Sequence, residues 1–462
     1  MSDDTLRSTC ESPMPKHFVK RFSTVTKMAA IAVLVLLLLI PLAMVQSVLR
    51  ERLNRRDEAV REITSTWGRE QVVIGPILMI PYKYNQRIWK EQVLNGRIER
   101  VETMESAQRR AYFLPSVFSA DGTLKPDRLN RGIYETVVYS GALNLRGSFD
   151  RPSFEEWRVD PEMILWDEAE IALSITDLRG AKESLKIRLA DQTIQLMPGR
   201  KMEGFENGIY AKIKNLNGQM DSIPFEISLT LNGSRSLRFA PVGVNNDVQL
   251  SSNWPAPSFQ GAFLPAAREV GPKGFRAHWK VSYYGRSYPQ QWTDKTTINA
   301  GSVASSLFGV DLVPALDSYR SVERAIKYGV LLIALLFTAF FLFEILSAVR
   351  IHPFQYTLVG IALCLFYLGL LALSEVTSFG AAYWTGAAVS VAMIALYSAR
   401  VMQSKARACI VAAGLGLVYA FLYVILRLQD YSLLVGTAGL FAVLALVMYV
   451  TRNIDWYARD SE

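Results

Sequence analysis

The chain has 462 residues, of which 50% are hydrophobic and 20% are charged, and its formal net charge is +8. This composition is too apolar for an average soluble enzyme. It also excludes a disordered chain, which lacks the apolar residues that a core needs. Basic and acidic residues between positions 28 and 327 are mixed without a basic stripe. Because nucleic-acid binding needs clustered Lys and Arg, no nucleic-acid partner is expected.

Six apolar stretches are long enough, or nearly so, to cross a bilayer as helices, which takes about 20 residues each. The first lies near the N-terminus and is longer than the apolar part of a signal peptide, so it is expected to remain as an anchor. The other five lie between residues 328 and 450, where only eight side chains are charged. The predicted spans are residues 28–49, 328–349, 357–373, 381–398, 408–426 and 432–450.

Basic residues in the short connections predict the orientation of these spans. Residues 350–356 and 399–407 carry Arg or Lys, whereas residues 374–380 carry neither. Since cytoplasmic loops hold the excess of positive charge, both basic loops are expected in the cytoplasm, together with both chain termini. The predicted parts are a cytoplasmic tail (1–27), a transmembrane helix (28–49), a periplasmic domain (50–327), a five-helix transmembrane bundle (328–450) and a second cytoplasmic tail (451–462).

The first helix is expected to extend past the membrane. From Leu49 to Trp67, apolar residues recur every three or four positions with one polar interruption, which is the spacing of a helix face. Gly68 is the predicted end of this helix. Residues 50–67 therefore form either a rigid stalk or a helix packed on its own domain. The second is favoured because amphipathic helices usually pack within their domain.

The rest of the exported segment is predicted to be mostly β. Short apolar runs, several with period two, alternate with Gly, Pro, Asn and Asp, a pattern typical of a β-sandwich. Asp121-Gly122 and Asn232-Gly233 predict hairpin turns. The predicted strands are residues 72–81, 133–145, 169–175, 185–196, 208–213, 225–231 and 274–284.

The expected fold is thus a polytopic α-helical membrane protein with a large inserted β-rich, sandwich-like periplasmic domain. It has six transmembrane helices, one N-terminal and five C-terminal. Small residues recur at four-residue spacing in two of the spans, which predicts close helix–helix packing. These two sets are Ala382, Gly386 and Ser390, and Ala412, Gly416 and Ala420.

The exported segment shows no pattern of catalysis. It contains no Cys and a single His, His278, so it lacks disulfides and the ligands of a zinc site. Nucleotide-binding loops and nucleophile motifs do not occur in the sequence. Acidic residues cluster at 160–170, where Glu168 and Glu170 would share a strand face. A solvated face explains them better than a weak cation site. No catalytic residue, cofactor or metal is predicted, and the protein is expected not to be an enzyme.

The most distinctive stretch of the exported segment is residues 253–265, which contains three prolines. Prolines interrupt sheet pairing, so this stretch is expected to be a stiff loop or a sheet edge. Trp254, Phe259 and Phe263, with Arg268 just beyond, are candidates for a periplasmic interaction surface. The alternative is a long connection that the aromatic side chains pin onto the sandwich, and this is the more ordinary use of such residues.

Glu344 is the one ionisable side chain well inside a predicted span. A charge in lipid costs at least about 2.5–3.5 kcal/mol, so Glu344 is a candidate intramembrane functional residue. Two explanations stay open, a functional site and a side chain that reaches the cytoplasmic interface or supports a helix contact. A solute pathway normally shows several polar residues at mid-membrane, and here there is one. Glu375 and Asp430 lie at outer helix ends and are expected to be solvated.

Several long and unusual stretches resemble the CreD family of bacterial inner-membrane proteins, and the resemblance runs from Phe22 to Tyr457. It implies a role in cell-envelope integrity and stress response, typically under a two-component system, and carries no catalytic residue. The first 15 residues depart from the family pattern. The stretches are 75–81 (GPILMIP), 253–265 (NWPAPSFQGAFLP), 268–270 (REV), 274–279 (GFRAHW), 340–344 (FFLFE), 352–356 (HPFQY), 371–375 (LALSE) and 451–457 (TRNIDWY).

The expected function is that of a non-enzymatic inner-membrane protein that helps to keep the envelope intact under stress. Its periplasmic domain would contact an unidentified envelope protein or a cell-wall partner, while the bundle contacts the lipid bilayer. The oligomeric state is left open. The alternative is a transporter or lipid-handling protein that uses Glu344, and a periplasmic wall hydrolase is the least favoured function.

Overall fold

The structure, a computed structural model, describes residues 24–94, 97–181, 183–199, 208–296, 298–312, 318–347, 351–428 and 431–452. The predicted cytoplasmic tails, Arg350 and Asp430 lie wholly or largely outside these residues. Two compact units are present. The helical unit comprises residues up to Asn54 and from Asp317 onward, and the β unit runs from Arg55 to Leu316. The division falls inside α1 (Thr24–Trp67), a single helix that contributes to both units.

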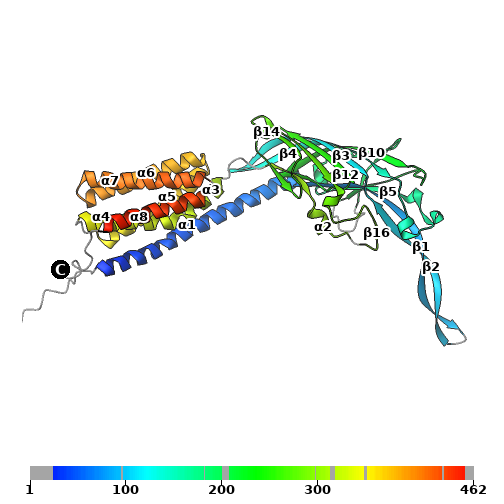
Figure 1. Cartoon of the computed structure of the whole chain (residues 1–462), viewed down its shortest axis with the longest axis horizontal. Helices are drawn as coiled ribbons and strands as arrows, with labels where there is room; N and C mark the ends of the chain where they lie inside the picture. Colours follow the sequence, from blue (N-terminus) through cyan, green and yellow to red (C-terminus); the bar gives the residue numbers. More distant parts are fainter. Residues whose placement is uncertain are drawn as a thin grey trace, which may run out of the picture. The chain divides into compact units, whose positions relative to one another are not determined.

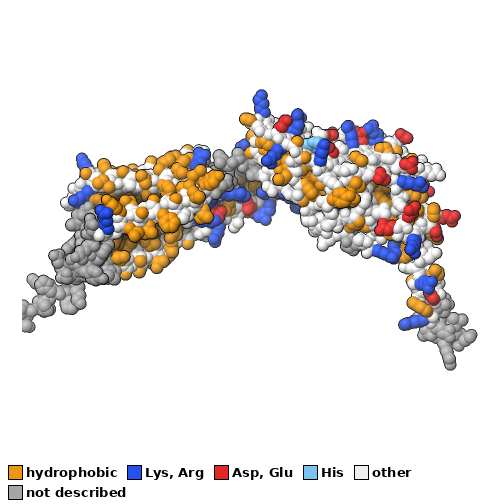
Figure 2. Space-filling view, viewed as in Figure 1, with side chains coloured by type: hydrophobic (Ala, Val, Ile, Leu, Met, Phe, Trp, Pro, Cys, Tyr) orange, Lys and Arg blue, Asp and Glu red, His pale blue; other side chains and the backbone are white. Residues whose placement is uncertain are grey.

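The helical unit contains, within the described residues, the first part of α1 and six further helices. Side chains cap several of these helices at their first turn: Ser378 accepts a bond from Ala381 N, and His352 forms a capping box with Gln355. Hydrophobic side chains cover much of the unit's outer surface (Figure 2). The helices are α3 (Ser318–Lys327), α4 (Gly329–Ser347), α5 (Pro353–Ser374), α6 (Phe379–Val401), α7 (Lys405–Arg427) and α8 (Ser432–Thr451).

Five helices of the described chain are long and apolar enough to cross a membrane, namely α1, α5, α6, α7 and α8. A sixth span results only if α3 and α4 are counted together, and these two are bent by 43° at their junction. α3 is amphipathic and buries Val322, Ala325 and Ile326. Five apolar helices and a β unit fit a polytopic membrane protein, whereas the predicted count of six spans depends on the bent pair.

One of the two predicted small-residue packing faces is correct. On α6, Ala382 and Ser390 are 1% and 2% exposed, and Gly386 lies against Phe366 of α5. On α7, by contrast, a Cβ added at Gly416 would meet nothing within 4 Å. The α7 prediction is wrong for that position, because the buried face of this helix is formed by larger side chains such as Tyr419.

Two sheets form the β unit (Figure 1). The first sheet has nine strands. They are β1 (Gln71–Leu94), β2 (Arg97–Phe113), β5 (Glu170–Ile175), β8 (Met197–Pro198), β9 (Gly208–Lys212), β11 (Ser236–Phe239), β13 (Pro257–Gly261), β16 (Gln291–Thr293) and β17 (Phe308–Leu312). Seven of them follow the order β13-β17-β11-β1-β5-β9-β8, while β2 pairs with β1 and β16 with β2.

The second sheet has eight strands, in the order β14-β15-β12-β3-β4-β10-β6-β7. Buried and exposed residues alternate along several of them, as in β12 and β15. Leu145 and Trp279 of this sheet belong to the same buried cluster as Leu78 and Phe239 of the first sheet, so the unit is sandwich-like. The strands are β3 (Val117–Arg131), β4 (Tyr134–Asp150), β6 (Lys186–Leu189), β7 (Gln192–Gln195), β10 (Ser222–Ser234), β12 (Asn245–Ser252), β14 (Ala267–Gly271) and β15 (Gly274–Ser282).

The β-rich prediction is confirmed, but both predicted hairpin turns are wrong. Asp121 and Gly122 lie inside β3, and Asn232 and Gly233 lie inside β10. In both places the glycine meets a close neighbour instead of forming a turn. A Cβ at Gly122 would lie 2.5 Å from the side chain of Leu250, and one at Gly233 would lie 2.4 Å from the ring of Tyr139.

β1 and β2 continue beyond the sheet as a two-stranded arm (Figure 1). The arm comprises residues 84–94 and 97–107, whose strand pairing is with each other. β5 pairs with β1 only as far as Met79, and β16 reaches β2 only at Ala111. The arm exposes 67% of Trp89 and 62% of Met104.

Candidate functional site

Glu344 lies near the C-terminal end of α4 and is only 8% exposed. The hydroxyl of Tyr356, in the first turn of α5, donates a hydrogen bond of 3.1 Å to Glu344 Oε2. Phe337 and Phe340 place their rings edge-on against Tyr356, at centroid distances of 5.5 and 6.1 Å. The carboxylate predicted as an intramembrane functional residue is therefore buried, hydrogen-bonded and held beside a cluster of aromatic rings.

A pocket lies next to this pair, where α4, α5 and α6 meet. The space that a water-sized group can occupy in it has room for about one such group. Ser398 lines the pocket, is 2% exposed, and its hydroxyl has no hydrogen-bond partner among the residues that the structure describes. Unpaired buried hydroxyls are uncommon, and the space beside this one is large enough for a single water molecule to bond it. The lining residues are Phe340, Ile351, Gln355, Tyr356, Val359, Tyr397, Ser398, Val401 and Met402.

Glu375, at the end of α5, was expected to be solvated, and this prediction is wrong. Its side chain is 11% exposed and lies 3.6 Å from Arg52 of α1. Tyr319 of α3 donates a hydrogen bond of 3.1 Å to the same carboxylate. Glu375 thus joins three helices of the helical unit, which explains why an acidic residue at a helix end is buried. Asp430, the other residue of this prediction, lies outside the described residues.

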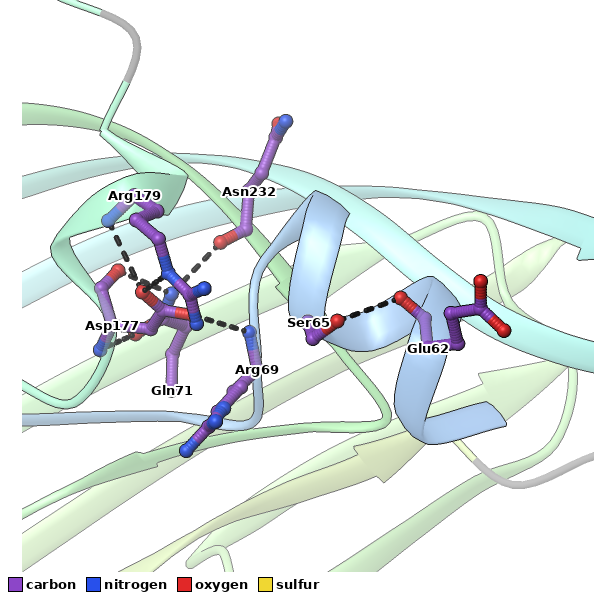
Figure 3. Close-up of polar contacts among 7 residues, drawn as sticks. All are labelled: Glu62, Ser65, Arg69, Gln71, Asp177, Arg179 and Asn232. Atoms are coloured by element: carbon purple, nitrogen blue, oxygen red, sulfur yellow. Dashed lines mark hydrogen bonds and ion pairs between the residues drawn. The ribbon is translucent and has the colours of Figure 1, made fainter. Parts of the chain in front are cut away.

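A buried polar cluster fixes the end of α1 within the β unit (Figure 3). Gln71 directly follows this end and is 0% exposed. Its side-chain amide donates to the backbone carbonyls of Asp177 and Asn232, at 3.0 and 2.9 Å, and its amide oxygen accepts from Asp177 N. Gly68, which ends the helix as predicted, has φ +143° and leaves no room for a side chain beside Asn232 O.

The carboxylate of Asp177 completes this cluster, which we call the α1 joint (Gly68, Gln71, Asp177, Arg179 and Asn232). It accepts bonds from the backbone N–H groups of Arg69 and Arg179 and from the Arg179 guanidinium, at 2.9–3.1 Å. Burial of the carboxylate raises its pKa, but the Arg179 side chain and the two backbone donors outweigh this. The net pKa of Asp177 therefore lies below its ordinary value of 3.8.

The last turns of α1 make further contacts with the β unit. Trp67 Nε1 donates a hydrogen bond of 3.3 Å to the Tyr139 carbonyl. Glu62 forms an ion pair with Arg131. Val60 and Ile63, on the predicted apolar stripe, are half-buried. The C-terminal part of α1 is thus attached to the β unit mainly through its end.

The candidate interaction residues Trp254, Phe259, Phe263 and Arg268 lie in a segment, 253–271, that divides into buried and exposed parts. Trp254 is 6% exposed, and its ring N–H donates to Ala256 O. Phe259 packs edge-on against Phe275 and Trp279, and Phe263 packs against Phe308. The aromatic side chains pin the segment onto the core. The exposed part includes Arg268 together with Leu264 and Val270, which are 68% and 52% exposed.

The segment also supplies a strand to each sheet. β13 lies at the edge of the first sheet and β14 at the edge of the second. β14 is short and exposed, and prolines lie nearby at positions 265 and 272. Such features hinder the edge strand of a sheet from pairing with a strand of another chain. Any partner of this surface is therefore expected to contact side chains such as Arg268 rather than add a strand.

The remaining sequence-predicted polar residues have structural partners. His278 lies 2.8 Å from Asp247 on the neighbouring strand. Glu168 lies in a 3-10 helix and not in a strand, so the predicted strand face with Glu170 is wrong. In the part of the chain that the structure describes, no group of three or more His, Cys, Asp or Glu residues could hold a metal ion.

Sequence analysis missed a group of buried hydroxyls between α6 and α7. Tyr383 donates to the Tyr419 carbonyl at 2.7 Å, and the Ser390 and Tyr419 hydroxyls lie 2.9 Å apart. Tyr383 is 0% exposed, so it does not belong to the interfacial aromatic belt that its position near a helix end suggests. The one available signal was Ser390 on the predicted packing face of α6.

Comparison with known proteins connects the chain to one family. A family model described as inner membrane protein CreD matches residues 23–457. The inner membrane protein CreD of Escherichia coli (strain K12) is 33% identical over 433 residues, covering 94% of this chain and 93% of that protein. Among solved structures, yeast LTA4 hydrolase matches 46% of this chain and 35% of its own length. The match has 10% identity, with TM-scores of 0.19 for the bestatin complex and 0.18 for the native form. The chain therefore belongs to the CreD family of inner membrane proteins.

Proposed function

We propose that this inner membrane protein is non-enzymatic and contributes to envelope integrity under stress through contacts of its β unit with an envelope protein or the cell wall. In this proposal the β unit lies in the periplasm and both chain termini lie in the cytoplasm. The proposed orientation rests on the basic short loops at 350–356 and 399–407. The relative from Escherichia coli is named for its place in the inner membrane, and the role in integrity goes beyond that name.

The observation that carries the proposal is that the two ends of α1 have different surroundings. Its N-terminal part is apolar and exposed, as lipid contact requires, with Leu36 and Ile40 exposed by 64% and 60%. Its C-terminal end enters the β unit and is fixed there by the α1 joint. A domain anchored through one unbroken helix and a hydrogen-bonded, largely buried cluster is suited to holding or sensing a partner at the membrane surface.

The test uses a strain that lacks the protein and measures its resistance to detergent. The full chain should restore resistance, and a chain that lacks residues 69–312 but reaches the membrane should not. Photo-crosslinking residues placed at Leu264, Arg268 and Val270 should capture one specific envelope component. A crosslinker at Ile133, which is 52% exposed on the same unit, is the control. Equal capture from Ile133, or full resistance without the β unit, would contradict the proposal.

A second candidate function, transport or lipid handling through Glu344, is favoured by the burial of this carboxylate beside a pocket. Glu344→Gln and Glu344→Ala should then abolish function without lowering the amount of protein in the membrane. Wild-type resistance from both variants would exclude a functional role for the carboxylate and leave the β-unit proposal intact.

A further inference from the structure

We propose that two copies of this chain associate through their arms, with β2 of one copy pairing antiparallel to β2 of the other around a two-fold axis at Val101. This inference concerns the assembly of the chain and is independent of the envelope role of the β unit. The arm (residues 84–94 and 97–107) extends beyond the first sheet, so its edges lie apart from the rest of the unit (Figure 1).

The outer edge of the arm is the strand edge of β2. Along residues 97–107, β2 pairs with β1 and with no other strand that the structure describes, because β16 reaches β2 only at Ala111. An unpaired strand edge is a template for a further strand. A ribbon of two strands is marginally stable in water, and three or more strands make a stable sheet. A strand from a second molecule would therefore stabilise the arm.

Symmetry restricts the register in which two identical strands can pair. In an antiparallel pair, alternate residues direct their backbone groups toward the same edge. Residues that lie opposite each other in a symmetric pair must therefore differ by an even number of positions. Near the middle of the arm, this rule allows registers centred on Arg100, on Val101 or on Glu102.

The charges of β2 select the register centred on Val101. In this register Arg100 of each copy lies opposite Glu102 of the other, and opposite charges across a strand pair are stabilising. A register centred on Arg100 would set this residue against itself, and one centred on Glu102 would do the same with a carboxylate. Like charges directly opposite are destabilising. Charged residues usually keep a strand edge from pairing, and their order here permits one register.

The charges on β1 agree with this register. Glu102 lies 3.3 Å from Arg87 of β1 in an ion pair whose side chains are 43% and 73% exposed. Arg100 lies opposite Glu91 in the pairing of β1 with β2. In the four-stranded sheet of the dimer, each Arg100 would have a Glu on both sides, and each Glu102 would have an Arg on both sides. The charges would thus alternate across the sheet.

The same register covers an exposed apolar side chain. Met104 is 62% exposed, and it would face Ile98 of the other copy, on the ribbon face that also carries Trp89. The edge of β1 fits a second copy less well. A symmetric pair centred on Trp89 would set Ile88 opposite Lys90, so this edge would place a charge against an apolar side chain.

Cysteine crosslinking in isolated membranes tests the register, in a chain whose native Cys10, Cys364 and Cys409 are replaced. Val101→Cys should give a disulfide-linked dimer under mild oxidation, because position 101 faces itself. Ser106→Cys, at an exposed position of the same strand, is the control, since its two copies would lie about 33 Å apart. Equal crosslinking from both positions, or a dimer from Trp89→Cys in place of Val101→Cys, would overturn the proposal.

Charge reversal gives a second test, in which native mass spectrometry measures the dimer of the purified full chain. Arg100→Glu and Glu102→Arg each set two pairs of like charges at the interface, so each should weaken dimerisation at least about tenfold. Both positions are exposed, so the variants should fold. When the two variants are coexpressed with different tags, both opposite-charge pairs return, and the variants should copurify as a mixed dimer.

A wild-type chain that stays monomeric at all concentrations would overturn the proposal and leave the arm to another partner. Failure of the coexpressed variants to copurify would overturn the assigned register. Because the readout is association of the chain with itself, its failure is distinct from loss of detergent resistance.

Discussion

Asp177 shows, at the scale of a single residue, how one carboxylate fixes the end of α1. It is 5% exposed and bonds Arg179 and two backbone N–H groups. Replacing it by Ala leaves the two part-buried backbone N–H groups of Arg69 and Arg179 without this acceptor, at a cost of about 1–3 kcal/mol in the free energy of unfolding. Unfolding of the β unit can be followed by tryptophan fluorescence, since of the nine Trp residues only Trp384 and Trp456 lie outside it.

The lowered pKa of Asp177 also predicts a pH dependence. Because the folded state holds this carboxylate ionised more strongly than the unfolded chain does, its stabilisation is complete above the unfolded pKa near 3.8. The stabilisation is lost as the pH falls through the lower folded pKa. Between about pH 5 and pH 2, the unfolding midpoint of wild type should therefore fall more than that of Asp177→Asn. Parallel pH profiles for the two proteins would contradict the assigned role.

Gly180 tests the close packing of the same joint. A Cβ at this position would lie 2.2 Å from the Asn232 carbonyl oxygen, so the backbone must move to admit it. Gly180→Ala is expected to lower the free energy of unfolding by about 1–3 kcal/mol through overpacking. Gly271→Ala is the matched control, since its Cβ meets nothing within 4 Å. Denaturant titration gives the unfolding midpoint of each variant. Equal midpoints would show that the backbone of the joint moves to admit the methyl group without loss of stability, which would contradict the prediction.

Among the elements, the strands that were predictable are those with an apolar face. β5 is buried at all six positions, and β15 alternates buried and exposed residues, so their sequences carry a clear signal. β2 and the second half of β3 were not predictable, because their sequences are largely polar and have no apolar period. The low exposure of Glu375 could not be predicted from the sequence either, since its partners Arg52 and Tyr319 are distant in the chain.

Arm residues 84–107 contribute little to the stability of the β unit, in spite of their length. Trp89 and Met104 are largely exposed, and the arm pairs only with itself along the two strands. Replacing residues 86–105 by a two-residue turn should change the free energy of unfolding by no more than about 0.5 kcal/mol. Loss of detergent resistance by this stable variant would assign a contact role to the arm. A large drop in the unfolding midpoint would instead show that the arm supports the sheet.

At the scale of the whole molecule, the sequence predicts the membrane part well. It does not predict the strand topology of the β unit. Long apolar helices are a local property of the chain, so α5 to α8 are visible in the sequence within a few residues. The order of strands in a sheet depends on partners far apart, such as β1 beside β11 and β12 beside β3. Around the pocket between α4, α5 and α6, Glu344 was predictable as a notable residue, but Ser398 was not, because its burial arises only where these helices meet.

The number of spans and the orientation can be settled together by labelling single cysteines. In a chain whose native Cys10, Cys364 and Cys409 are replaced, Ile133→Cys in the β unit and Val376→Cys between α5 and α6 are both exposed. If the bent α3–α4 pair crosses the membrane, both positions lie outside and react with an impermeant maleimide in spheroplasts.

Ala406→Cys, exposed at the start of α7, should then react only after lysis, because it lies in the basic loop predicted to be cytoplasmic. If α3 and α4 do not cross, α5 becomes the next span and the last two results exchange: Ala406→Cys reacts in spheroplasts and Val376→Cys does not. Protection of Ile133→Cys would place the β unit in the cytoplasm and overturn the proposed function.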